Sequence, residues 1–126
     1  MIIQPITDID QWRKPIYIAS KTGTSVDDEG NSISVYDTPT LYKFNYRAVS
    51  SQAEMQEFGE DAKIMLRMVI PIKEYLNVFK EFDVAYCYGA SPDNEEVNGQ
   101  NANYRLLPPR NGGSVIIIYM KRIDGK

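Results

Sequence analysis

The segment Ser114–Arg122, which reads SVIIIYMKR, decides the fold class of this chain. β-Branched and aromatic residues favour a strand, and the run has strand length. A strand with one solvated face alternates apolar and polar residues, but this one is apolar on both faces. One interpretation is that its own chain covers both faces. The other is that one face fills the core and the other meets a neighbouring subunit, which makes Ile116, Ile118 and Met120 candidate interface residues.

Outward from this segment, the sequence predicts further strands separated by turn signals. Leu41–Val49 alternates cleanly between its two faces, as expected for a half-buried strand. Asn111-Gly112-Gly113 is a strong turn signal before the last strand. Such a chain predicts an all-β domain over residues 1–126, a small antiparallel β-barrel or sandwich of about six strands with long loops. Residues 1–12 are expected to form an N-terminal arm. The other expected strands are Arg13–Ser20, a strand from near Ile33, Lys63–Ile70, Asp83–Tyr88 and Ala102–Leu107.

One or two short helical turns are predicted, of which the first lies in the segment 50–62. Ser51 and Glu54 have the spacing of a helix capping box, and Gly59 is a plausible end. The segment is acidic but carries two apolar residues, Met55 and Phe58, which are hard to justify on a solvated loop. The candidate interface residues here are Met55, Glu57 and Phe58.

The polar loop Gly89–Gln100 is long for its place, and such loops are often functional or disordered. It carries Asp93, Glu95 and Glu96, which we expect to be solvated on a mobile loop. These carboxylates lack the ligand spacing and the central glycine of an EF-hand, so they predict no calcium site.

The composition argues against an enzyme. The sequence has no histidine, which removes the usual general base and the commonest metal ligand. Its single cysteine, Cys87, lies in an apolar strand and is expected to be a core residue. Glu54 and Glu57 are close in sequence, but no apolar pocket is expected there to shift a pKa. We therefore predict no catalytic residues, no metal and no cofactor.

Charge and hydropathy limit the partners. The net charge of −3 disfavours a general affinity for nucleic-acid phosphates. No apolar run approaches the ~20 residues that span a bilayer, and no secretory signal is visible at the N-terminus, so no membrane partner is expected. A lone cysteine is typical of a reducing interior.

From about Lys14 to Arg122, the order of segments resembles the small head–tail joining proteins of tailed bacteriophages, also called head-closure or stopper proteins. Phe82-Asp83 takes the place of the Gly-Asp pair that starts a strand in this family, with Phe instead of Gly. The segments that carry the resemblance are Pro15–Ile18, Asp27–Asn31, Tyr42–Tyr46, Ala53–Gly59, Phe82–Tyr86, Asn101–Arg105 and Ile116–Tyr119.

The resemblance implies a small β-barrel with a long mobile loop and no active site. The protein would form a dodecameric ring below the portal and its adaptor, retain the packaged DNA and offer a docking surface to the tail. Its partners would be copies of itself, portal or adaptor proteins and tail proteins. DNA would pass through without specific binding, which suits an acidic chain. The expected location is the head–tail interface of the virion, and the host cytoplasm during assembly.

Two alternatives remain open. One is another phage neck or tail component, such as a tail terminator or a tail-completion protein. The other is a small OB-like barrel that binds a nucleic-acid strand by stacking its bases on aromatic side chains. In that case the stacking residues would be Tyr42, Phe44 and Tyr46, with Lys43 and Arg47 beside them.

Overall fold

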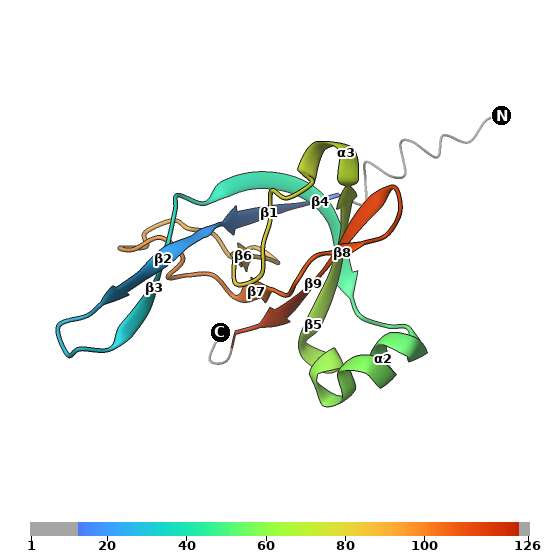
Figure 1. The fold of residues 1–126 in the computed structure, drawn as a ribbon, viewed down its shortest axis with the longest axis horizontal. Coiled ribbons are helices and arrows are strands. Elements are labelled where there is room, and N and C mark those ends of the chain that lie inside the picture. The colour runs from blue at the N-terminus through green and yellow to red at the C-terminus, as the bar shows by residue number, and fades with distance from the viewer. Residues whose placement is uncertain (1–12, 124–126) are drawn as a thin grey trace.

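The computed structural model describes residues 13–123, which form a closed antiparallel barrel of six strands (Figure 1). Neighbouring strands follow the order β5-β4-β1-β6-β7-β9, and pairing of β9 with β5 closes the barrel. The predicted β class is therefore confirmed, and the barrel is the correct choice between barrel and sandwich. The arm predicted at residues 1–12 lies outside the described residues. The barrel strands are β1 (Lys14–Ala19), β4 (Thr40–Ala48), β5 (Met65–Pro71), β6 (Val84–Tyr86), β7 (Tyr104–Leu106) and β9 (Val115–Arg122).

The interior of the barrel is filled with apolar side chains from alternate positions of each strand. A six-stranded barrel is narrow enough for side chains to fill it completely. The inward positions of β4 are Phe44 and Tyr46, which are 5% and 1% exposed. Further core residues are Ile16 and Ile18 of β1, Leu66, Met68 and Ile70 of β5, and Leu106 of β7.

The structure corrects the interface prediction for Ile116, Ile118 and Met120. All three belong to the barrel core, and Ile118 and Met120 are fully buried. Successive side chains of a strand point to opposite faces, so the face that carries these three residues is the one turned inward. They fill the interior and are not open to a neighbouring subunit.

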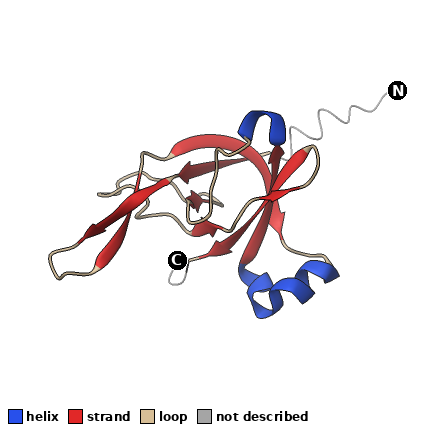
Figure 2. Cartoon of the chain, viewed as in Figure 1, coloured by secondary structure: helices blue, strands red, loops and turns tan. Residues whose placement is uncertain are grey.

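The protein's own helices cover the outer face of β9 at Tyr119, whereas Val115 and Ile117 on the same face are only partly buried, so the first interpretation holds for one part of this face. Tyr119 is 6% exposed and packs with Val49, Ala62 and Met65 beneath α2 (Gln52–Phe58) and the 3₁₀ helix η1 (Gly59–Ile64). Figure 2 shows both helices beside the lower ends of β5 and β4. One face of β9 therefore lines the barrel, and Tyr119 on the other face supports the helices.

The predicted capping box of α2 is confirmed. The Ser51 side chain accepts a hydrogen bond from the Glu54 amide, and the Glu54 side chain accepts one from the Ser51 amide. The helix ends at Gly59, whose φ of 59° lies in the left-handed region that glycine tolerates. A shorter helix, α3 (Ile72–Tyr75), begins directly after Pro71 at the end of β5.

Three strands lie outside the barrel proper. β2 (Lys21–Val26) and β3 (Ser32–Tyr36) pair only with each other, in a hairpin that projects from the barrel (Figure 1). From here on, "the arm" means this hairpin of β2 and β3 and not the N-terminal arm expected at residues 1–12. The sequence predicts β3, as the strand from near Ile33, but not β2, whose residues Lys21–Ser25 have little apolar character. The third, β8 (Arg110–Asn111), pairs with β9 and begins directly after Pro108 and Pro109.

Candidate interaction surfaces

The arm carries apolar side chains that face solvent. Val26 is 67%, Ile33 45% and Val35 39% exposed. Ile33 and Val35 share one face of β3, and Val26 lies on the other face opposite Ser32. An isolated two-stranded hairpin is marginally stable in water, so this ribbon gains from any surface that covers it.

The root of the arm is held by buried and paired polar groups. The carboxylate of Asp83, which is 2% exposed, accepts hydrogen bonds from the amides of Lys21 and Lys80, each at 3.0 Å. Ser20 and Asp37 exchange two more bonds at 2.9 Å, one through the Asp37 side chain and one between backbones. These bonds fix the direction in which the arm leaves the barrel.

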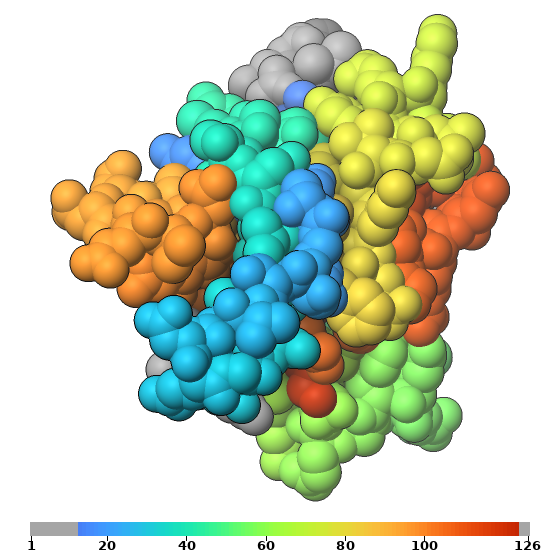
Figure 3. Space-filling model, turned by 60° about the vertical axis from the view of Figure 1, so that its left-hand side comes forward, coloured from blue at the N-terminus to red at the C-terminus, as the bar shows by residue number. Residues whose placement is uncertain are grey.

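The loop 89–101 supports the arm from one side (Figure 3, where the loop is orange and the arm is blue to cyan). The Asn98 side chain donates to the Tyr36 carbonyl at 3.4 Å. Gly99 has φ of +88°, and a Cβ there would approach the Tyr36 ring to 2.6 Å, so only glycine fits this contact. The loop and the root of the arm therefore pack as one unit.

Glu95 anchors the loop Gly89–Gln100, which the sequence predicts to be mobile, to the rest of the chain. The Tyr86 hydroxyl donates to both Glu95 oxygens, at 3.0 and 2.9 Å, and the Asn101 amide donates to one at 3.1 Å. Burial, followed by the bond to Glu95, raises the pKa of Tyr86 well above its usual value. Glu95 is therefore a structural acceptor and not a solvated carboxylate, which corrects the expectation for this residue. Asp93 and Glu96 are exposed, as expected.

The segment 50–62 forms a tightly connected cluster against the barrel. The Phe58 ring lies 4.8 Å from the Tyr119 ring, centroid to centroid, and is half-buried. Glu57 forms an ion pair with Arg110, whose guanidinium lies over both rings at 5.5 and 4.9 Å. Of the three interface residues predicted here, Phe58 and Glu57 thus have partners within the chain, and Met55 is 50% exposed.

Glu54 is the electrostatic centre of this cluster. It accepts a hydrogen bond from the Tyr119 hydroxyl and lies 3.5 Å from the Arg67 Nε. Burial works to raise the pKa of Glu54, but the bonds from Tyr119 and Ser51 and the charge of Arg67 together lower it. The bond from Arg110 lowers the pKa of Glu57 as well. Both carboxylates are therefore held in the charged form, which suits anchoring and not acid catalysis.

The outer face of β4 is a second exposed surface. Leu41, Lys43, Asn45 and Arg47 alternate with the core residues and are all exposed. Where this face meets the end of β5 there is a hollow of about 390 Å³. We call it the β4 hollow. Its apolar part is formed by Val69, Ile70, Pro71, Val115, Phe44 and Tyr75, and its polar rim by Arg13, Lys43, Asn45, Glu74 and Ser114.

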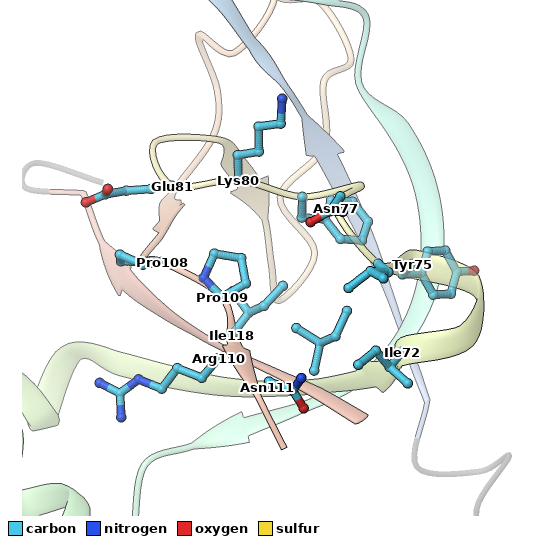
Figure 4. A pocket seen from close by; sticks show the side chains of 13 residues that line it. Ile72, Tyr75, Asn77, Lys80, Glu81, Pro108, Pro109, Arg110, Asn111 and Ile118 are labelled. Carbon is cyan, nitrogen blue, oxygen red and sulfur yellow. The ribbon is translucent and has the colours of Figure 1, made fainter. Parts of the chain in front are cut away.

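A cavity of about 340 Å³ opens at one end of the barrel, between α3 and β8 (Figure 4). Ile72, Pro109 and Ile118 face its interior, whereas the charged ends of Lys80 and Glu81 point away. Polar groups do not converge in it, so it lacks the arrangement expected of an active site.

Two further expectations concern reactive or binding residues. Cys87 is fully buried, as predicted, and burial raises the pKa of its thiol to about 12, which keeps it protonated. Phe44 and Tyr46 lie inside the barrel, so they are not open to stacking with nucleic-acid bases.

Among residues 13–123, no group of His, Cys, Asp and Glu side chains is arranged to hold a metal ion. In the same range no helix is long and apolar enough to cross a membrane.

These features define a small closed antiparallel β-barrel with a projecting hairpin and a helical cover over β9. No protein-family model matches the sequence, and neither does a curated protein. The solution structure of protein SF1141 from Shigella flexneri 2a, a structural genomics target, has a similar fold, with a TM-score of 0.56. The two chains are 16% identical, and the match covers 94% of this chain and 99% of that one. At this identity the likeness shows the fold alone.

Proposed function

We propose that this chain is a structural protein of the head–tail connector of a tailed bacteriophage. Copies of it form a ring that closes the DNA-filled head and provides the surface to which the tail attaches. The ring contacts portal or adaptor proteins on one side and tail proteins on the other. DNA passes through it without specific binding.

The observation that carries this proposal is the arm with Ile33 and Val35 exposed on one face of β3. Asp83 holds the root rigidly, while the apolar part of the ribbon extends beyond the barrel. Exposed apolar side chains on a fixed projection are typical of a surface that another protein covers. A connector subunit, which is surrounded by copies of itself and by other virion parts, has this requirement.

The barrel and the charge support the same proposal. The resemblance to head–tail joining proteins implies a small β-barrel, and the chain has this architecture. The net charge of −3 disfavours tight contact with the phosphates of DNA that must move past the protein.

The proposal is tested by virion assembly with altered arms. Particles are made from the genome that encodes the chain, with its gene replaced by an Ile33→Asp/Val35→Asp variant. The matched control is Ser32→Asp/Ser34→Asp, which places the same charges on the opposite face of the same strand. We expect the first variant to give tailless heads that lose DNA in electron micrographs, and the control to give tailed particles.

Tailed, infectious particles from a complete gene deletion would refute the connector function. Cross-linking of the chain in assembled particles distinguishes the main alternative. Contacts with the portal or its adaptor support head closure, whereas contacts with only the tail-tube proteins support a tail terminator.

A further inference from the structure

We propose that the arm of one copy docks into the β4 hollow of a second copy, in a head-to-tail contact. This inference rests on the proposed function, because it specifies how the subunits of the ring meet. Both surfaces are exposed in the single chain: the arm through Ile33 and Val35, and the hollow beside Lys43.

The positions of the two surfaces rule out docking within one chain. The arm leaves the barrel after Ala19, at the end of β1, whereas Arg13 on the rim of the hollow precedes the start of the same strand. In Figure 1 the arm extends to the left, and the ends of β5 and α3, which border the hollow, lie on the right. A contact between two different patches is heterologous. Repeated from copy to copy, it forms a ring when the rotation between neighbouring copies adds up to a full turn.

The apolar parts of the two surfaces fit each other in kind. Ile33 and Val35 stand on one face of an extended strand, about 7 Å apart. The hollow offers Val69, Pro71 and Val115 as apolar contacts and, at about 390 Å³, has room for more than one side chain. Covering these groups removes apolar surface from water on both partners.

The charges of the two surfaces are complementary. The tip of the arm presents the exposed carboxylates of Asp28 and Glu29. Asp27 is occupied within the turn, where it accepts bonds from two backbone amides. The rim of the hollow carries two basic residues, Arg13 and Lys43, and one acidic residue, Glu74. A further basic residue, Arg47, lies farther along β4. Opposite charges across a contact favour the correct orientation and suppress wrong pairings.

A charge exchange between two variants tests this contact. The arm variant is Asp28→Lys/Glu29→Lys, and the hollow variant is Arg13→Glu/Lys43→Glu. Each variant alone places like charges on both sides of the contact. In an equimolar mixture, the basic arm of the arm variant meets the acidic hollow of the hollow variant. The unchanged acidic arm of the hollow variant likewise meets the unchanged basic hollow of the arm variant.

Self-association is measured by sedimentation equilibrium up to millimolar concentration, with circular dichroism to confirm that each variant folds. We expect the wild type to associate, each variant alone to associate at least tenfold more weakly, and the mixture to recover. The matched control is Lys80→Glu/Arg105→Glu, which makes the same charge change at exposed residues away from the hollow and should associate like the wild type. A monomeric wild type, variants that associate normally, or a mixture that does not recover would each overturn the proposed contact.

Coexpression of the two variants during virion assembly separates this contact from the proposed function. Tailed particles from the pair, but not from either variant alone, support both. If each variant alone gives tailed particles while the gene deletion does not, the connector function stands and this contact is wrong. If the mixture recovers in solution but the gene is dispensable for tail joining, the contact stands and the function is wrong.

Discussion

Phe82 has a backbone conformation that is unusual for a side chain of its size. Its φ is 77°, in the left-handed region, and its ring is 48% exposed and lies 5.3 Å from the Lys21 Nζ. The turn into β6 needs this positive φ, which costs residues other than glycine free energy.

We expect Phe82→Gly to be more stable than Phe82→Ala by about 1 kcal/mol, because both lose the ring but only glycine tolerates this φ without strain. Denaturant unfolding of the two variants measures the difference. An alanine variant as stable as the glycine variant would show that the turn relaxes to a negative φ.

Glu54 gives the stability of the protein a defined dependence on pH. Its pKa is lowered in the folded state below the ordinary 4.5, because its hydrogen-bond donors and Arg67 outweigh the effect of burial. The stabilisation is therefore complete above about pH 4.5 and is lost as the pH falls through the folded-state pKa.

Glu54→Gln is expected to lower the free energy of unfolding by about 1–2 kcal/mol at pH 7. The difference in the free energy of unfolding between variant and wild type should shrink as the pH falls below about 4.5, because protonation then removes the same charge from Glu54 in the wild type. Thermal unfolding between pH 3 and 7 tests this, with Glu60→Gln, whose side chain is 90% exposed, as the control. A gap that does not change with pH would contradict the assignment.

Single residues differ in how far the sequence predicts their roles. The Ser51–Glu54 capping box was predictable because all its partners lie within four residues. The role of Asp83 was not, because its partner Lys21 is 62 positions away in the sequence. The sequence predicts a solvated Glu95 for a related reason, since nothing in the neighbouring residues indicates that Tyr86 donates to it.

At the scale of elements, α2 and η1 form a cover that the barrel does not need for closure. Phe58, Tyr119 and Arg110 join this cover to β9 and β8 through ring and cation–π contacts. The sequence indicated that Phe58 needed a partner but not whether the partner lay in the same chain. The structure supplies one, so the apolar residue left exposed on this helix is Met55.

Phe58→Ala is therefore expected to loosen the helical cover while the barrel stays folded, because Phe58 is half-buried outside the main core. Amide hydrogen exchange should speed up in 52–64 and remain slow in β4 and β1. Met55→Ala, on the exposed side of the same helix, is the control and should change neither. Global unfolding of the Phe58 variant would show that the cover is part of the barrel's cooperative unit.

At the scale of the whole molecule, alternation along the strands predicted the β class but not the closure. Periodicity shows that Leu41–Val49 has two different faces, yet a barrel and a sandwich share this pattern. Closure depends on the register of β5 with β9, which pairs Met65 with Lys121 and Pro71 with Val115. No local signal specifies a pairing across about fifty residues, so the sequence alone leaves open which side of β9 faces inward.

Ile118→Ala tests the corrected assignment. A fully buried isoleucine truncated to alanine leaves a cavity and is expected to lower the free energy of unfolding by about 2–5 kcal/mol. Ile33→Ala, on the exposed arm, should change it by no more than about 0.5 kcal/mol. Urea unfolding compares the two. Equal effects would mean that β9 does not line the core.

β9 also determines when the protein can fold during synthesis. It pairs with β5, β7 and β8, so the nascent chain carries unpaired edges on β5 and β7 until β9 leaves the ribosome. Open strand edges recruit other chains. A chain that ends before Val115 therefore keeps these two edges open and is prone to aggregate, so the barrel closes only when translation has passed β9.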